Sequence, residues 1–172
     1  MVSMLKPLLV ELAAQCRADP TRAVAESGAV CGSEPGDPLK WTVTGSPSSV
    51  ETMTSGQHPL LGGDGSGPCP GELLAMAIAS CMDGTIRGIA DLLDVQLDSI
   101  RVEVVNRGDI RQFLRAMDVP QQDTGISMRI QIRPRPGEDE EKVAKLRAAA
   151  EQGSAVLNLV RSGAPVSVSW ES

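Results

Sequence analysis

One long apolar segment constrains this chain more than any other feature of its sequence. Residues 67–90 read GPCPGELLAMAIASCMDGTIRGIA, and no proline interrupts the stretch after Pro70. Proline is tolerated at the start of a helix because its missing N–H would have no helical partner there. Apolar side chains cover most of the circumference, so we expect a helix that is nearly wholly buried. Such a helix needs cover from more than one sheet, and a second copy of the chain is the simplest source of it.

Length, composition and charge exclude several classes of partner. The chain has 172 residues, a net charge of −6 and an isoelectric point near 4.8. These values argue against a nucleic acid or an anionic membrane as partner. No apolar run looks long enough to span a bilayer, and the N-terminal segment predicts an amphipathic helix, not a signal peptide. We therefore expect a cytoplasmic protein that binds no nucleic acid and no membrane.

The cysteines do not form a metal-binding pattern. Cys16, Cys31, Cys69 and Cys81 show no CxxC spacing, and the chain has a single histidine, His58, which we expect to lie in a loop. We therefore expect no metal site, no cofactor and no structural disulfide. The glycine-rich loop at 56–67 lacks the lysine of a phosphate-binding loop.

The order of predicted elements indicates a single α+β domain spanning residues 1–172. It comprises an N-terminal helix within 1–20, strands and the glycine-rich loop in 21–66, and a helix–strand–helix–strand core in 67–172. Besides the central helix, which should end near residue 94, the pattern predicts helices at 3–17, 138–152 and 155–160. Strands are predicted at 22–31, 39–45, 50–55, 95–107, 111–117, 125–133 and 165–170, with Ile126, Met128, Ile130 and Ile132 facing inward.

The glycine-rich loop followed by GPCPGELLAMAIASCM resembles the OsmC/Ohr family, named for osmotically induced protein C and organic hydroperoxide resistance protein. The resemblance covers about residues 50–170. It implies an intertwined homodimer in which a long buried central helix packs against antiparallel sheets. It also implies an oxidative-stress function, the thiol-dependent reduction of organic hydroperoxides, with a small-molecule peroxide and an external thiol reductant as partners.

The same resemblance assigns roles to individual positions. Cys81 matches the peroxidatic cysteine, whose thiolate attacks the peroxide and becomes a sulfenic acid. The family's resolving cysteine falls on Ser154, which cannot form a disulfide. The family's active-site glutamate falls on Gly71, so Glu72 beside it becomes the catalytic candidate. Arg22 is the candidate for the family's arginine.

The residues themselves leave other interpretations open. Cys81 is also typical of an inert core thiol, and Glu72 also suits the positive end of a helix dipole. Cys69, a candidate secondary thiol, lies at the helix start. A disulfide from it to Cys81 within one helix is excluded, because twelve residues span roughly 18 Å. Across two helices of a dimer that disulfide stays open. The alternative functions are a non-catalytic dimer that binds a small apolar ligand, and a structural role.

Overall fold

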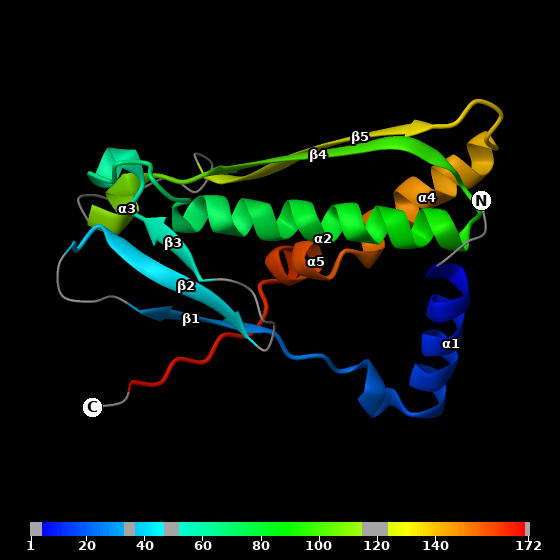
Figure 1. Ribbon diagram of the computed structural model, residues 1–172, viewed down its shortest axis with the longest axis horizontal. Helices are drawn as coiled ribbons and strands as arrows, with labels where there is room; N and C mark the ends of the chain where they lie inside the picture. The colour runs from blue at the N-terminus through cyan, green and yellow to red at the C-terminus, as the bar shows by residue number, and fades with distance from the viewer. Residues whose placement is uncertain (1–4, 33–36, 47–51, 115–123, 171–172) are drawn as a thin grey trace. The chain divides into compact units, whose positions relative to one another are not determined.

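The structure is a computed structural model that describes residues 5–32, 37–46, 52–114 and 124–170 (Figure 1). The elements, in chain order, are α1 (Leu5–Ala18), a 3₁₀ turn (Pro20–Ala23), β1 (Gly28–Gly32), β2 (Lys40–Ser46), β3 (Met53–Gly56), a second 3₁₀ turn (Pro59–Leu61), α2 (Pro70–Leu92), β4 (Leu97–Arg107), α3 (Ile110–Leu114), β5 (Gly125–Pro134), α4 (Glu140–Gly153) and α5 (Ala155–Ser162). Helices and antiparallel strands both contribute, as the α+β prediction requires.

The chain divides into two compact units, each assembled from separate stretches of sequence. Unit 1 comprises Met1–Val10, Ala77–Glu103 and Arg129–Ser172, and unit 2 comprises Glu11–Met76 and Val104–Met128. The long elements α2, β4 and β5 therefore each contribute residues to both units. The organisation of residues 1–172 as a single domain stays a prediction.

Unit 2 contains a three-stranded antiparallel meander. β2 pairs with β1 on one side and with β3 on the other, with Val30 opposite Thr44 and Thr42 opposite Thr54. This confirms the predicted meander, but the strand expected from residue 22 begins only at residue 28. Residues 20–23 form a 3₁₀ turn instead, because the Asp19 side chain accepts the Thr21 N–H and so caps the turn.

The burial of α2 differs from the sequence-based expectation. Its buried residues are Ile78, Met82, Ile86 and Ala90, which recur every four positions and so form one stripe. On the rest of the helix large apolar side chains face solvent, and Met76 is 53% exposed. The expectation of near-complete burial is wrong for a single chain, because the elements of one chain cover only one face of the helix.

α2 also corrects the statement that no segment is long enough to cross a membrane. Among the described residues, this one helix meets the criteria of length and composition, with 23 residues and a mean hydropathy of 1.4 over its most apolar window. The core helix of a soluble protein meets the same criteria, so these values do not by themselves place α2 in a membrane.

The core of unit 1 forms where α2 and α4 bury matching stripes. α4 begins after Asp139, whose side chain accepts the backbone N–H groups of Glu141 and Lys142. It buries Val143, Leu146 and Ala150. Residues 97–103 of β4, residues 129–134 of β5 and α5 also belong to this unit, and α5 buries Leu157. On β5, three of the four residues expected inward are half-buried and Ile130 is exposed.

Two predicted strands are absent at their expected places. Residues 110–114 form α3, a short helix that follows Asp109, whose carboxylate accepts the Arg111 N–H. The rest of that predicted strand, 115–117, lies outside the described residues. Residues 164–170 have no regular structure, and Trp170 is 93% exposed. The segment alternates Val166, Val168 and Trp170 as a strand would, but among the described residues it pairs with no strand.

Candidate active site

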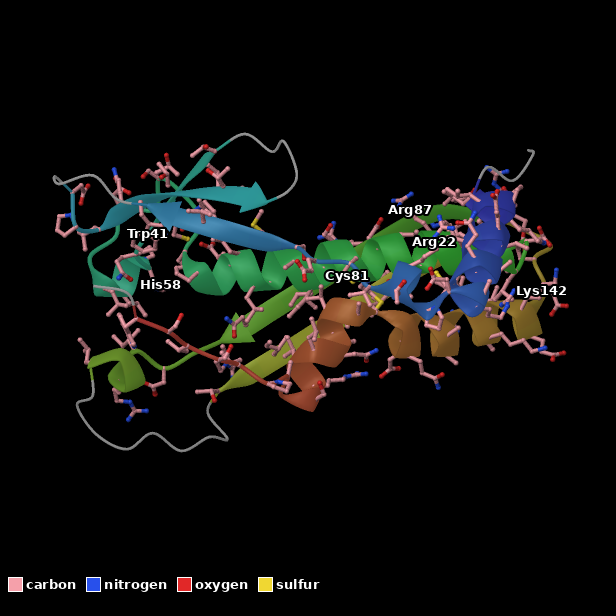
Figure 2. All side chains as sticks on the ribbon, turned by 90° about the horizontal axis from the view of Figure 1, so that it is seen from below. Arg22, Trp41, His58, Cys81, Arg87 and Lys142 are labelled. Carbon is pink, nitrogen blue, oxygen red and sulfur yellow. The ribbon has the colours of Figure 1, made fainter. Side chains whose placement is uncertain are left out.

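Cys81 lies in the middle of α2 and faces the start of α5. The Ser154 hydroxyl donates a hydrogen bond to Cys81 Sγ across 3.5 Å, although the two residues are 73 positions apart. Ser154 is fully buried and Cys81 is half-buried. Figure 2 shows the labelled Cys81 on the green α2 ribbon beside the orange-red ribbon of α5. All these residues belong to unit 1.

Ser154 occupies the N-cap position of α5 without capping that helix. Serine at this position ordinarily accepts a backbone N–H from the first helical turn. The Ser154 side chain makes no such bond, and its hydroxyl is directed at the sulfur of Cys81 instead. The backbone N–H groups of Ala155 and Val156, in the first turn of α5, also act on the sulfur and lower the pKa of Cys81. The Ser154 hydroxyl and the start of α5 therefore both favour a negative charge on Cys81 Sγ.

These contacts favour the thiolate form of Cys81. Burial is the largest single influence and raises the pKa of the thiol, because a charge is harder to hold away from water. The hydrogen bonds from Val156, Ser154, Thr85 and Ala155 together outweigh burial, so the pKa of Cys81 lies below its ordinary value. Thr85 has one hydroxyl proton, which in this structure points to the carbonyl oxygen of Cys81 at 2.7 Å. The thiolate is the nucleophilic form of cysteine, so these surroundings suit reaction.

Cys69 and Glu72 meet each other at the start of α2. Cys69 is the N-cap residue, and its N–H donates to Glu72 Oε2 across 2.8 Å. This is half of a capping box, in which the acid three positions into a helix binds the backbone of the N-cap. The cap and the Cys69 thiol, which donates to the same carboxylate, lower the pKa of Glu72.

Comparison with known proteins connects this geometry to a family. The model of the OsmC-like proteins matches residues 63–169, which include α2, Cys81 and Ser154. The chain belongs to the OsmC-like protein family. No curated protein is significantly similar to this chain in sequence.

Solved structures of OsmC-like proteins share the fold. An organic hydroperoxide resistance protein OsmC from Legionella pneumophila is 16% identical, with a TM-score of 0.57 over 80% of this chain and 90% of that one. An OsmC-like protein of unknown function from Vibrio cholerae is 14% identical, with a TM-score of 0.61 over 78% and 93%. The organic hydroperoxide resistance protein OhrB of Bacillus subtilis is 17% identical, with a TM-score of 0.50 over 80% and 91%. At these identities the likeness concerns the fold.

At Gly71, where the family resemblance expects a glutamate, a side chain would require the Asn106 side chain to move. A Cβ atom at Gly71 would lie 3.0 Å from Asn106 Nδ2 and 3.8 Å from Cys69 Sγ. Asn106 also donates to the carbonyl oxygen of Gly71 across 3.4 Å. In this OsmC-like chain the adjacent acid, Glu72, holds the helix cap and lies nine residues before Cys81, about 13 Å along the helix. A catalytic role for Glu72 beside Cys81 stays a prediction.

Within unit 1, neutral groups lower the pKa of Cys81. These groups are the backbone N–H groups of Ala155 and Val156 and the Ser154 hydroxyl. Arg87, two turns further along α2, pairs with Asp83 instead. Arg22 lies in the 3₁₀ turn of unit 2, and its role stays a prediction.

The remaining candidates are placed as follows. His58 caps the 3₁₀ turn at 59–61, since its Nδ1 accepts the Leu60 N–H across 3.1 Å, which confirms the expected loop position. Cys16 is half-buried in α1 and Cys31 is exposed on β1, and all four cysteines are free thiols. Among the described residues, no group of three acidic, histidine or cysteine side chains is arranged to hold a metal ion.

Sequence reasoning missed the N–H groups of Ala155 and Val156 as part of the site. A backbone N–H has no residue signature, so it becomes a candidate only when a helix start is placed beside a reactive group. The sequence did contain the two needed signals, a helix predicted from residue 155 and a family alignment that brings position 154 to Cys81.

Proposed function

We propose that this OsmC-like protein reduces organic hydroperoxides, with Cys81 as the peroxidatic thiol and an external thiol as the reductant. The observation that carries the proposal is the Ser154 hydroxyl, which donates to Cys81 Sγ across 3.5 Å at the start of α5, and the α5 N–H groups of Ala155 and Val156 add to it by lowering the pKa of Cys81. Donors placed in this way stabilise the thiolate before reaction and the negative charge that remains on the group as the peroxide bond breaks.

The first step consumes one peroxide for each Cys81. The thiolate attacks the terminal oxygen of ROOH, the O–O bond breaks, and the S–O bond of a sulfenic acid forms while the alkoxide leaves and takes a proton from water to become the alcohol ROH. The sulfenic acid is the reversible first rung of cysteine oxidation. Ser154 lies beside this group and can donate a hydrogen bond to it, but its oxygen cannot form a disulfide.

The second half of the cycle therefore needs another thiol. The sequence has no cysteine after Cys81, and Ser154 occupies the place where the resemblance expects the resolving sulfur. A small external thiol attacks the sulfenic sulfur, releases water and forms a mixed disulfide. A second thiol then restores Cys81 and leaves as the small disulfide.

We also propose that the protein works as a homodimer. The exposed apolar face of α2, with Leu74 and Met76, and the unpaired alternating residues Val166, Val168 and Trp170 support this proposal. Contiguous exposed apolar surface is typical of an interaction site. The OsmC/Ohr resemblance indicates that the partner is a second copy of the chain.

Intact-mass analysis after treatment with cumene hydroperoxide tests the chemistry. We expect one sulfenic acid per chain, trapped by dimedone and located at Cys81 by peptide mapping. The Cys81→Ser variant should consume no peroxide, while the Cys69→Ser variant should keep the initial rate. Absence of stoichiometric oxidation at Cys81 would refute the peroxidase function and favour the non-catalytic alternatives.

A further inference from the structure

Cys81 has hydrogen-bond donors beside it but no second thiol in its own unit. The Ser154 hydroxyl donates to Cys81 Sγ across 3.5 Å, whereas Cys16, Cys31 and Cys69 all belong to unit 2. We propose that Cys81, once oxidised, is held as a sulfenate anion and is the site of a second oxidation to sulfinate, which stops turnover when peroxide exceeds thiol. This inference rests on the proposed peroxidase function and sets a limit to it.

The Ser154 hydroxyl is held toward the sulfur by its surroundings. Ser154 lies between α4 and α5 and is fully buried, so its hydroxyl cannot turn to water. The backbone on either side is fixed as well, because the Asn158 N–H donates to the Ser154 carbonyl oxygen and the Asn158 side chain donates to the Gln152 carbonyl oxygen across 2.7 Å. The donor therefore keeps its place when the chemical state of the sulfur changes.

The start of α5 adds to the effect of the hydroxyl. The first N–H groups of a helix have no partner within the helix, and the Ser154 side chain does not cap those of α5. A helix start attracts negative charge, and the N–H groups of Ala155 and Val156 lower the pKa of Cys81. The environment of Cys81 Sγ therefore favours whichever form of the group is negative.

The first oxidation moves this negative charge from the sulfur to an added oxygen. The 3.5 Å between Ser154 Oγ and Cys81 Sγ leaves room for an oxygen bonded obliquely to the sulfur, at about 2.7 Å from Oγ. That separation is typical of a hydroxyl that donates to an oxyanion, and such bonds are stronger than those between neutral groups. The donors that favour the thiolate therefore also favour the sulfenate over the neutral sulfenic acid.

The charge of the sulfenate decides between its two reactions. A thiolate reductant is repelled by the negative group, and the sulfenic oxygen leaves as water only when it is protonated. A neutral hydroperoxide is not repelled, and the electron-rich sulfur of the sulfenate attacks it. Reduction therefore prevails when thiol is abundant, whereas excess peroxide leads to a second oxidation.

The second oxidation balances with one more hydroperoxide. The sulfenate sulfur attacks the terminal oxygen of ROOH, the O–O bond breaks and a second S–O bond forms. The proton of the transferred hydroxyl passes to the leaving alkoxide, which becomes ROH. The sulfur loses two electrons and the peroxide gains them. Because thiols do not reduce a sulfinate, each such event removes one chain from the cycle.

The surface of α2 beside Cys81 has room for a second peroxide. Cys81 is half-buried, and Gly84, three positions further along α2, is exposed. Residues three apart are neighbours on the surface of a helix. Among the described residues, no atom from another part of the chain lies within 4 Å of the place that a Gly84 Cβ would take. The space that admits the first peroxide is therefore free again once the alcohol has left.

The test counts the oxygen atoms added to each cysteine of the full chain in the absence of any thiol. One equivalent of cumene hydroperoxide is added first and an excess afterwards, and both samples are analysed by peptide mapping. We expect a dimedone-reactive sulfenic acid at Cys81 after the first equivalent and sulfinate at Cys81 after the excess. The exposed Cys31 is the internal control, and it should form sulfinate at least about tenfold more slowly.

The possible results separate this inference from the peroxidase function. A sulfenic acid at Cys81 that persists in excess peroxide, ends only in a disulfide, or passes to sulfonate without accumulation of sulfinate would overturn the inference and leave the peroxidase function standing. If no sulfenic acid forms at Cys81, the peroxidase function is itself refuted, and the inference with it.

Two substitutions at position 154 test the part played by the hydroxyl. Starting from the sulfenic acid, Ser154→Ala should slow the formation of sulfinate by about fivefold, because the anion loses a donor. Ser154→Cys places a thiol in the same position, so a disulfide should form and the sulfinate should not. An unchanged rate in the Ser154→Ala variant, or sulfinate formed as readily in the Ser154→Cys variant, would overturn the inference when both variants have native circular dichroism spectra.

Discussion

Replacing Ser154 with cysteine should restore an internal disulfide to this chain. The Ser154 Oγ and Cys81 Sγ atoms are 3.5 Å apart, and a disulfide requires about 2 Å, so the two groups need to approach by about 1.5 Å. The loop between them spans 73 positions, and closing a loop of this length stabilises a protein by about 4 kcal/mol on the chain-entropy model. For a chain of this size that value corresponds to a rise in melting temperature of roughly 8–16 °C.

The assay treats the Ser154→Cys variant with one equivalent of cumene hydroperoxide and measures thermal unfolding with and without a reductant. We expect a disulfide between Cys81 and the introduced cysteine in non-reducing peptide maps, loss of dimedone trapping, and a higher melting temperature before reduction than after it. The double variant that also carries Cys81→Ser should form no such disulfide, and its melting temperature should not depend on the reductant. An oxidised Ser154→Cys protein in which the two thiols remain unlinked would refute the placement of residue 154 beside Cys81.

Three further predictions follow from single contacts in the structure. Ser154→Ala removes a donor to the thiolate and should raise the pKa of Cys81, so alkylation by iodoacetamide below that pKa should slow by about fivefold; an unchanged rate–pH profile would contradict the role of the hydroxyl. Gly67→Ala should lower the free energy of unfolding in urea by about 1–3 kcal/mol, because its Cβ would overlap the carbonyl oxygen of Thr54. Gly28→Ala has open space around it and should change that free energy by less than about 0.5 kcal/mol. Met76→Glu should convert the proposed dimer to monomer in light scattering, and a stable dimer of that variant would exclude the exposed face of α2 as the interface.

The contribution of Cys81 to the stability of the folded chain depends on pH in a defined direction. Because the pKa of Cys81 is lower in the folded chain than its ordinary value, its thiolate forms at lower pH when folded than when unfolded. The stability contributed by this group is therefore absent below the folded pKa and grows as pH rises through it.

The elements that could be predicted from the sequence are those with a local signal. α2 follows from a long apolar segment that no proline interrupts after Pro70, and α4 from the helical pattern of residues 138–152. The segment at 110–114 is too short to distinguish the periodicity of a helix from that of a strand. The Asp109 carboxylate, which accepts the Arg111 N–H, favours the helix that the structure has there. The tail at 164–170 has the alternation of a strand, but a strand also needs the edge of a sheet to pair with. The sequence of the tail does not show whether such an edge is available to it.

Some features of the candidate site could also be predicted from the sequence, and others could not. The family pattern identified Cys81 and Ser154 as related positions, and the structure places them in contact. It did not indicate that Ser154 would leave its own helix uncapped, because the residue is typical of an N-cap. Nor could it show that Glu72 binds the backbone of Cys69, since an acid in the first turn of a helix has several suitable partners.

The uncapped start of α5 has a consequence for the helix itself. If the Ala155 and Val156 N–H groups stabilise the thiolate, the thiolate stabilises those N–H groups by the same free energy, since the two are one interaction. The charge of Cys81 then acts as the removable cap of α5, in the place that the Ser154 side chain has left. Protonating or alkylating a single sulfur atom should therefore loosen the first turn of a helix 73 positions away in the sequence, and amide hydrogen exchange would record it as faster exchange at residues 155 and 156.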